Sequence, residues 1–477
     1  MINQKEKMDT ICAIATPAGG ALGIIRVSGP EAITVADRIF RPRVGAPLSQ
    51  RAASSLTFGN VVAPQTDEAI DEVLVSLFRA PHSYTGEDSV EFSCHGSYYI
   101  LNKVVELLLA QGCRMARPGE YTERAFLNGK MDLSQAEAVA DLIASTTEAN
   151  HRMAMQQMRG GFSKELRTLR DQLLHITSLL ELELDFSDHE ELEFASRPEL
   201  LALAERIRNH ISTLCQSFRL GNALKRGVPV ALVGETNAGK STLLNALVGE
   251  ERALVSNVHG TTRDTIEEIV NVGGTLVRFI DTAGIRETSD TVERMGIERT
   301  FDKMAEADIV LWLIDLTAYQ AQYDELAEKI GVQVQGKHLV VLLNKTDLVS
   351  ESTINEAKQY ISGQLNNAVP TPMLLTLSAQ SGSGLDQLKQ LLAASLSTLQ
   401  AENNSTGTIV SNLRHYEALS AALAATDRVI EGLHQGLSGD FVSQDLRECI
   451  YHLSDIVGEV TTDQVLGNIF KHFCVGK

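Results

Sequence analysis

The sequence predicts a multidomain protein of mixed α/β and α class, in which a doubly wound α/β domain is inserted into a helical domain that follows an N-terminal α+β domain. A glycine-rich loop of the phosphate-binding type directly follows the apolar run 228–233. Apolar residues recur at helical spacing on both sides of that segment, and short β-type runs precede it. We expect the N-terminal domain at 1–125, the two parts of the helical domain at 126–224 and 396–477, and the inserted domain at 225–395.

The N-terminal domain is expected to combine strands with at least one helix. Ile24–Val27 and Val73–Phe78 have the composition of strands and lie among glycines and prolines, whereas Tyr98–Ala110 has helical spacing. From Ser134 the pattern becomes helical throughout. Ser134 and Glu137 have the spacing of a capping box, so we expect a helix to begin there.

Two helical blocks flank the inserted domain. Residues 199–224 are expected to be helical, and the linker 401–408 separates the inserted domain from the second block. The apolar positions at helical spacing are Phe162, Leu166, Leu169, Leu173, Ile176 and Leu180, then Tyr416, Leu419, Leu423, Ile430 and Leu433, then Val442, Leu446, Ile450, Leu453 and Val457. The simplest arrangement packs the blocks on each other. The alternative, two separate helical domains, would require each block to bury its apolar stripe alone or in an oligomer.

Composition limits the possible partners and compartment. With a net charge of −19 over 477 residues, the chain lacks a broad basic surface, so an RNA target would require a basic partner. Six cysteines are scattered without close pairs, which indicates neither a zinc site nor a disulfide framework. The N-terminus is too polar for a signal peptide, and no apolar run reaches the roughly 18 residues of a membrane span. We therefore expect a cytoplasmic protein with no membrane segment.

The inserted domain opens with Gly234-Glu-Thr-Asn-Ala-Gly-Lys240-Ser241, which fits the phosphate-loop pattern. A strand, a glycine-rich turn and a helix N-terminus together direct backbone N–H groups toward phosphate oxygens. Lys240 is expected to reach the β- and γ-phosphates, and Ser241 to ligate magnesium. Alone, the loop indicates only a nucleoside triphosphate, and its alternative is an ordinary strand-turn-helix connection.

A second motif and a loop before it are expected to complete the magnesium site. Asp281-Thr-Ala-Gly284 closes the apolar run 276–280, where Asp281 can hold the magnesium shell through water and the Gly284 N–H can meet the γ-phosphate. Val258–Asp264 is expected to form the first switch. By its position, Thr262 should supply a hydroxyl to magnesium only when the γ-phosphate is present.

Two further motifs indicate which base is bound. Asn344-Lys345-Thr-Asp347 follows one apolar strand, and Ser378-Ala379 follows the next. The Asp347 carboxylate can accept two hydrogen bonds from the N1–H and exocyclic amine of guanine, whereas adenine offers no such pair. The sequence therefore predicts a GTP site.

These motifs do not identify the residue that orients the attacking water. Many regulatory GTPases have a glutamine directly after the Asp-x-x-Gly motif, but this chain has Ile285, whose aliphatic side chain cannot orient water. Glu287, Asp290 and Glu293 follow nearby and are alternatives. A solvated switch loop with a charged face explains any one of them equally well.

Taken together, these motifs and several segments outside the inserted domain resemble the MnmE family, also called TrmE, of tRNA modification GTPases. The similarity spans essentially the whole chain. The segments that carry it outside the inserted domain are Ala15-Thr-Pro17, Gly23-Ile-Ile-Arg-Val-Ser-Gly29, Tyr84-Thr-Gly-Glu-Asp88, Arg117–Lys130 and Phe473-Cys-Val-Gly-Lys477.

The resemblance implies a definite activity. Members of this family act with an FAD-dependent partner, called MnmG or GidA, and add a carboxymethylaminomethyl or aminomethyl group to C5 of the wobble uridine of certain tRNAs. FAD and NADH enter only through that partner, in a heterotetramer or larger complex. A reduced folate of the 5,10-methylene- or 5-formyl-tetrahydrofolate type is the implied one-carbon donor. The N-terminal domain would be folate-binding-like and would form a homodimer.

The resemblance also implies roles for particular residues. Folate contacts fall on Arg26, Glu91, Lys130 and Lys477, and Cys474 is a candidate nucleophile. The family places a potassium ion against the phosphates, which implies a potassium shell from Asn237, Ser256, Val258 and Thr261 when two G domains meet. Magnesium falls on Ser241 and Thr262, while Lys240 and Glu293 would act in hydrolysis, Glu293 by orienting water.

The GTP contacts expected from the motifs and the resemblance together are Asn237, Ala238, Gly239, Lys240, Ser241, Thr242, Ser256, Asn257, Val258, His259, Gly260, Thr261, Thr262, Asp281, Thr282, Ala283, Gly284, Asn344, Lys345, Asp347, Ser378 and Ala379. Glu235 and Thr236 depart from the family's usual Arg-Pro in the phosphate loop, and His259 stands in the first switch where small residues or proline are usual. A ribosome-assembly GTPase is the alternative function, although the missing basic face and the Phe-Cys-Val-Gly-Lys terminus argue against it.

Overall fold

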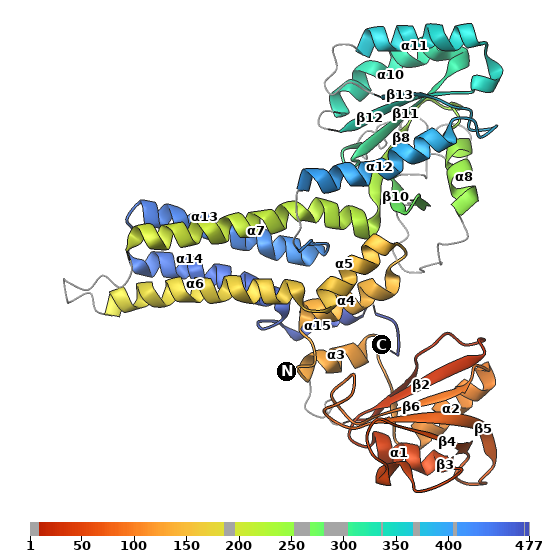
Figure 1. Ribbon diagram of the computed structural model, residues 1–477, viewed down its shortest axis with the longest axis vertical. Coiled ribbons are helices and arrows are strands. Elements are labelled where there is room, and N and C mark those ends of the chain that lie inside the picture. Colours follow the sequence, from red (N-terminus) through yellow and green to blue (C-terminus); the bar gives the residue numbers. More distant parts are fainter. Residues whose placement is uncertain are drawn as a thin grey trace. The chain divides into compact units, whose positions relative to one another are not determined.

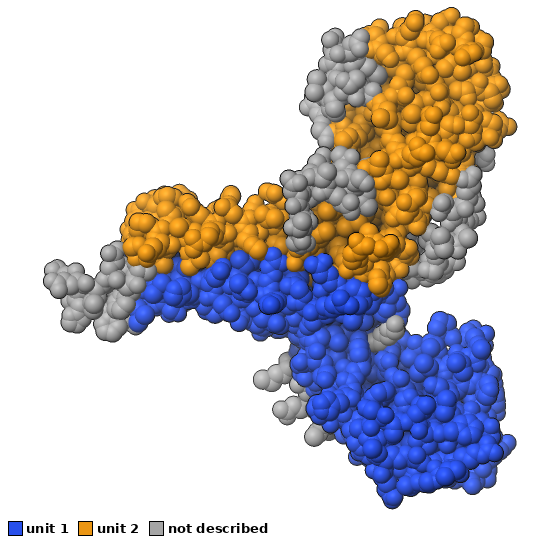
Figure 2. Space-filling model, in the orientation of Figure 1, with its two compact units in different colours: residues 1–143, 155–195, 438–477 blue, residues 144–154, 196–437 orange. Residues whose placement is uncertain are grey.

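The computed structural model describes residues 9–185, 196–251, 268–280, 304–334, 337–365, 373–403, 408–471 and 473–476. The chain forms two compact units (Figure 2). Unit 1 contains Met1–Ile143, Met155–Ala195 and Ser438–Lys477, and unit 2 contains Ala144–Ala154 and Ser196–Leu437. None of the described helices combines the length and apolar character needed to cross a membrane.

The N-terminal part of unit 1 is a seven-stranded sheet in the order β3-β4-β5-β6-β2-β1-β7 (Figure 1). Its elements are β1 (Ile11–Ile14), β2 (Leu22–Ser28), α1 (Ala32–Ile39), β3 (Phe40–Pro42), η2 (Leu48–Gln50), β4 (Ser55–Val62), β5 (Ala69–Phe78), β6 (Ser89–His95), α2 (Tyr98–Ala110) and β7 (Arg114–Met115). Alternate residues of each strand, such as Val73, Val75 and Leu77, are buried in one cluster with α1 and α2. The opposite face carries Arg26 and Glu91, which are paired in the β2–β6 register.

The rest of unit 1 is helical. Its elements are α3 (Glu120–Leu127), α4 (Leu133–Ala144), α5 (Glu148–Met158), α6 (Gly161–Asp185), α14 (Gly439–Val457) and α15 (Asp463–Phe470). The last residue of α4 and the first seven residues of α5 belong to unit 2. Helices α6 and α14 pack together. The predicted apolar face of α6 is buried, from Phe162 to Leu180.

The start of α4 differs from the sequence prediction. Asp132 and Gln135 form the capping box: the Gln135 N–H donates to the Asp132 carboxylate at 3.0 Å, and the Asp132 N–H donates to the Gln135 side chain at 2.9 Å. Ser134 lies inside the helix, and its hydroxyl donates to Asp132 at 2.9 Å. The predicted Ser134–Glu137 box is therefore wrong, because the aspartate two residues earlier also accepts from Arg167 and fixes the helix start.

Unit 2 contains a six-stranded sheet in the order β13-β12-β11-β8-β10-β9. Only β9 pairs antiparallel; the other neighbours are parallel. The strands are β8 (Val228–Val233), β9 (Glu268–Val272), β10 (Thr275–Ile280), β11 (Ile309–Asp315), β12 (His338–Asn344) and β13 (Met373–Thr376). The helices are α7 (Arg197–Arg226), α8 (Lys240–Glu251), η3 (Leu316–Ala318), α10 (Tyr319–Gln333), η4 (Thr346–Leu348), α11 (Glu351–Leu365), α12 (Leu385–Asn403) and α13 (Leu413–His434).

Apolar clusters cover both faces of this sheet, as a doubly wound fold requires. Val228, Val230 and Leu232 of β8 pack in one cluster with α7, α8 and α12. Ala231 and Val233 point to the other face and pack with α10 and α11. Because β8 is buried on both sides, its sequence is a continuous apolar run.

Helix α7 is joined closely to the rest of unit 2. It packs along α13, where the rings of Phe218 and Tyr416 stack with centroids 4.4 Å apart. Gly221 faces the chain just before α13, and a Cβ there would lie 2.0 Å from the Val410 carbonyl oxygen. The Val410 N–H donates to the Ser217 hydroxyl at 3.0 Å. In each unit, one helix from before the inserted α/β domain thus packs against one from after it.

Candidate functional site

The phosphate loop lies at the carboxyl end of β8, where the strand order reverses and doubly wound folds bind their ligands. Asn237 and Gly239 have φ values of 64° and 103°. A Cβ at Gly239 would lie 2.3 Å from the Asn344 amide nitrogen, and one at Gly234 would lie 2.3 Å from the Leu313 carbonyl oxygen. Glycine is therefore required at both positions, because the loop passes directly against its neighbours.

Lys240 begins α8 and points back into the loop. Its ammonium donates to the carbonyl oxygens of Gly234 at 2.6 Å and Glu235 at 2.7 Å. Burial lowers the pKa of Lys240, and the nearby Glu235 carboxylate partly offsets that effect. Burial and a hydrogen bond with the Glu325 carboxyl raise the pKa of Glu235. The cation is thus held at the concave side of the loop, where phosphate oxygens would bind.

Asn344 connects the phosphate loop to the second base-binding loop. Its amide nitrogen donates to the Ala238 carbonyl at 2.7 Å, and its amide oxygen accepts from the Ala379 N–H at 2.9 Å. The residue is 2% exposed, so both bonds are shielded from water. The Ser378 side chain, which is also buried, accepts from the Ser381 N–H at 3.1 Å. Two motifs far apart in the sequence are therefore held together by one side chain.

Lys345 and Asp347 lie beside this bridge. Lys345 has a φ of 66°, and its ammonium is 2.6 Å from the Asp315 carboxylate. Burial would raise the pKa of Asp315, but the hydrogen bonds from Lys345 and Thr317 and the charge of Lys345 together outweigh it, so the pKa lies below its ordinary value. Asp347 is exposed in η4, and no donor among the described residues contacts its carboxylate. That carboxylate can accept hydrogen bonds from a guanine edge.

Several predicted nucleotide residues lie outside the part of the chain that the structure describes. They are the first-switch and potassium-loop residues Ser256, Asn257, Val258, His259, Gly260, Thr261 and Thr262, the Asp281, Thr282, Ala283 and Gly284 motif, and Glu293. Ser241 and Thr242 are described and lie in the first turn of α8, directly after Lys240.

A second polar site lies on the open face of the N-terminal sheet. The Arg26 Nε donates to the Glu91 carboxylate at 2.8 Å, and both side chains are about one-fifth to one-quarter exposed, at 21% and 24%. The Arg26 guanidinium lies 5.4 Å from the ring centre of Tyr84 and 5.5 Å from that of Tyr121. Tyr121 also donates its hydroxyl to the Arg26 carbonyl at 2.8 Å. Two aromatic rings and a carboxylate therefore fix the arginine head.

The C-terminal tail passes over this site. The Gly476 carbonyl accepts from Arg26 Nη1 at 3.4 Å, and the Gly119 N–H donates to the Cys474 carbonyl at 3.3 Å. Cys474 itself is exposed, and Lys477 is outside the described residues. Lys130 contacts the loop between β5 and β6, residues 79–88, here called the Tyr84 loop, where its ammonium donates to the Pro81 carbonyl at 2.9 Å. The structure thus brings Arg26, Glu91 and the tail into contact, and the Tyr84 loop reaches from them to Lys130.

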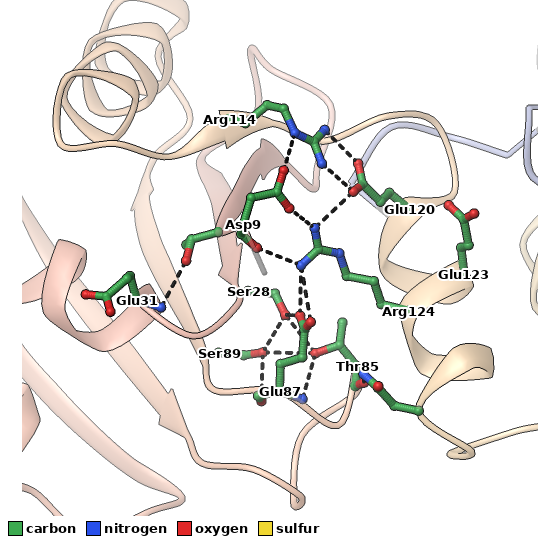
Figure 3. A network of polar contacts seen from close by, with 12 residues as sticks. Asp9, Ser28, Glu31, Thr85, Glu87, Ser89, Arg114, Glu120, Glu123 and Arg124 are labelled. Atoms are coloured by element: carbon green, nitrogen blue, oxygen red, sulfur yellow. Dashed lines mark hydrogen bonds and ion pairs between the residues drawn. The ribbon is translucent and has the colours of Figure 1, made fainter. Parts of the chain in front are cut away.

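A charge network around the buried side chains of Glu120 and Arg124 holds α3 on the sheet (Figure 3). Asp9 accepts from Arg114 at 2.7 Å and from Arg124 at 2.6 Å, and Arg114 also donates to Glu120 at 2.6 Å. Arg124 reaches Glu87 at 3.2 Å. Because α3 also carries Tyr121, this network positions one wall of the Arg26 site.

Sequence reasoning missed Tyr84, Tyr121 and Asp315 as contributors to these sites. Asp315 ends a buried strand, as the predicted motif residues do, and that position could have identified it. The Tyr84 and Tyr121 contacts had no comparable signal, because they join Arg26 to residues far away in the chain.

Comparison with known proteins identifies the family to which the chain is similar. The family model of the MnmE helical domain matches residues 133–474, and that of the GTP-binding protein TrmE N-terminus matches residues 10–130. The tRNA modification GTPase MnmE of Bacteroides fragilis is 58% identical over 470 residues, covering 98% of this chain and 99% of the relative. The Parabacteroides distasonis protein of the same description is 56% identical over 474 residues, covering 98% and 100%. A solved structure of Era with MgGDPNP and 16S ribosomal RNA overlaps 42% of this chain and 66% of its own, at 26% identity and a TM-score of 0.28, which is too low to support a conclusion.

Proposed function

Because this chain belongs to the MnmE family of tRNA modification GTPases, we propose that it couples GTP hydrolysis to modification of C5 of the wobble uridine in certain tRNAs. The added group would be carboxymethylaminomethyl or aminomethyl. An FAD-dependent partner of the MnmG or GidA type, which uses NADH, would share the reaction in a heterotetramer or larger complex. The observation that carries the proposal is that one chain contains both the Asn344 bridge, in unit 2, and the Arg26–Glu91 site, in unit 1.

The described residues of the nucleotide site each have a proposed role in GTP binding or hydrolysis. Lys240 would stabilise charge that develops on the β- and γ-phosphates, because its ammonium is already held inside the loop. Asp347 would select guanine, and the Ala379 N–H, which donates to Asn344, would hold the second base-binding loop in place. Magnesium would be held by Ser241 and by Thr262, whose placement rests on the motif alone.

Potassium would fit the phosphate loop at Asn237. The Asn237 side chain is exposed on a left-handed backbone, and its amide has no hydrogen-bond partner among the described residues, so its oxygen can ligate a cation. Ser256, Val258 and Thr261 would complete the shell when the G domains of a homodimer meet, and Glu293 would orient the attacking water. A fixed cation there would offset charge developing between the β- and γ-phosphates.

The N-terminal site has the donor and acceptor types that a reduced folate requires. Glu91 uses one carboxylate oxygen for Arg26, so the other can accept from the amino-pyrimidine edge of a pterin. Lys130 and Lys477 would bind the carboxylates of the glutamate tail. Bound folate would supply a one-carbon unit to the reaction. Cys474 remains a candidate nucleophile, because it is exposed and lies two residues before Gly476, whose carbonyl contacts Arg26.

Nucleoside mass spectrometry of tRNA tests the function directly. Cells that lack their own protein of this type would receive either this chain or its Lys240→Ala variant. We expect the modified wobble uridine to return with the native chain and to stay absent with the variant. If the modification stayed absent with both, although both proteins were present at normal levels, the tRNA assignment would fail.

GTP turnover in potassium compared with sodium tests the hydrolytic mechanism. We predict a rate about a hundredfold higher in potassium, since a fixed charge at the phosphates is worth a factor of that order. Asn237→Ala should lose most of this advantage while keeping nucleotide affinity. Equal rates in the two salts would remove the potassium mechanism and leave guanine binding untouched.

A further inference from the structure

A hollow with a volume of about 310 Å³ opens in unit 1 beside Lys130. Its walls come from the end of α3 and the turn after it, the start of α4, the N-terminal part of α6 and the end of α14. Phe126, Met131 and Val457 provide apolar surface, and Lys130 and Arg167 provide positive charge. The apolar side chains of the hollow can contact methylene groups, and its cations can bind carboxylates. The hollow therefore suits a flexible ligand chain that carries both.

The acidic groups in the walls are already paired. Asp132 accepts from Arg167 at 3.1 Å with one carboxylate oxygen, while its other oxygen caps α4. Glu459 is paired with Arg170. Lys130 donates to the uncharged Pro81 carbonyl, and no carboxylate among the described residues forms an ion pair with it. The walls hold two cations and two carboxylates, and Lys130 is the wall cation with no carboxylate partner among the described residues, so the positive charge lies at the Lys130 end.

We propose that this hollow binds the γ-linked glutamate chain of a polyglutamylated reduced folate, an inference that rests on the folate assignment above. The Tyr84 loop contacts Arg26 through the Tyr84 ring and Lys130 through the Pro81 carbonyl. A folate that reaches from Arg26 and Glu91 to Lys130 ends at the mouth of the hollow. Each further glutamate adds one carboxylate and two methylenes, which match the cationic and apolar walls. Arg167 is the specificity-determining residue, because it is half exposed at 50% and is the second cation that lines the hollow.

Calorimetry on the full-length protein tests this proposal, with 5-formyl-tetrahydrofolate carrying one or three glutamates at low ionic strength. We expect the triglutamate to bind about tenfold more tightly, as one added charge-assisted contact would give. Arg167→Gln should abolish that advantage without changing the affinity for the monoglutamate. Arg167→Lys keeps the charge and should retain much of the advantage, and thermal unfolding checks that each variant is folded.

Arg447→Gln is the matched control. It also removes one cation and one exposed ion pair, to Glu181 at 2.6 Å, but it lies outside the walls of the hollow and should keep the full advantage. Equal affinity of the native protein for both folates would overturn the proposal and leave the folate assignment standing. An advantage that survives in Arg167→Gln would also overturn it. Failure of both folates to bind would refute the folate assignment itself, and this inference with it.

Discussion

Glu120 illustrates how buried charge positions a site in this protein. The residue is 2% exposed, and it accepts hydrogen bonds from Arg114, from the Arg117 N–H and from Arg124. Removal of one partner from such a network leaves the others buried without compensation, which is strongly destabilising. The Tyr121 ring against Arg26 is carried by the same helix, so the network and the Arg26 site should weaken together.

This network predicts a dependence of stability on acid pH. Burial would raise the pKa of Glu120, but the hydrogen bond from Arg114 and the other contacts outweigh it, so the pKa lies below the ordinary value of 4.5. A carboxyl whose pKa is lower in the folded state stabilises the fold above pH 4.5, and that contribution is lost as the pH falls through the folded pKa. Glu120→Gln should cost about 3 kcal/mol at pH 7 and should flatten the acid loss.

Hydrogen exchange of peptides from residues 10–130, corrected for intrinsic rates at each pH, measures this effect in the full chain. Glu148→Gln is the control, because Glu148 is 85% exposed in its ion pair with Arg152 and should change stability by less than about 0.5 kcal/mol. An unchanged acid dependence in Glu120→Gln would contradict the assignment.

At the scale of single elements, strong local patterns predicted the structure and weak ones did not. The run at β8 and the helical spacing of α2 both gave the observed bounds, because one is apolar throughout and the other has a regular period. The start of α4 was placed two residues late, since Asp132 and Ser134 are equally good caps in sequence. The tertiary ion pair from Arg167 to Asp132 is what separates them.

The same limit applies to the candidate sites. Asn344, Lys345 and Asp347 could be identified because each follows a strand in a recognisable motif. The hydrogen bond from Arg26 to the Gly476 carbonyl joins residues that are 450 positions apart, and no local sequence pattern encodes such a contact. The buried strand β11 carries no motif, so Asp315 escaped notice even though it holds Lys345.

Helix α7 provides a test of element packing. Gly221→Ala would add helix propensity worth about 1 kcal/mol, but its Cβ would lie 2.0 Å from the Val410 oxygen, and overpacking of this kind costs about 2–3 kcal/mol. We predict a net loss of about 1–2 kcal/mol in the stability of unit 2. Gly363→Ala on α11 is the matched control, because nothing lies within 4 Å of a Cβ there and the substitution should stabilise.

The fluorescence of Trp312 follows urea unfolding in both glycine variants. Trp312 is the one tryptophan of the sequence, it is 1% exposed, and its ring stacks on Tyr323 in the core of unit 2. A stabilised Gly221→Ala would show that α7 and the Val410 segment separate without cost, contrary to the packing described here.

For the molecule as a whole, the order of the elements along the chain differs from their grouping in space. Helices α13 and α14 are neighbours in sequence but belong to different units, and the same holds for α6 and α7. Each unit is therefore completed by a segment from the other side of the inserted α/β domain. Helix α7 links that domain to the helical part of unit 2, because its side chains are part of the domain's core.

That continuity predicts how unit 2 can be divided. Leu220, Ala223 and Leu224 of α7 pack in the same cluster as Val228 and Val230, so a fragment of residues 228–403 would lose this part of its core, whereas residues 196–437 would keep it. Burial of two leucines and an alanine is worth roughly 4 kcal/mol. We predict that the longer fragment has a clearly higher unfolding temperature, measured by Trp312 fluorescence. The double substitution Leu220→Ala and Leu224→Ala in the longer fragment should remove most of this difference. Equal thermal unfolding midpoints for the two fragments would mean that the contact of α7 with the nucleotide-binding sheet contributes no stability. Such a contact could not transmit movement of the sheet to the helices.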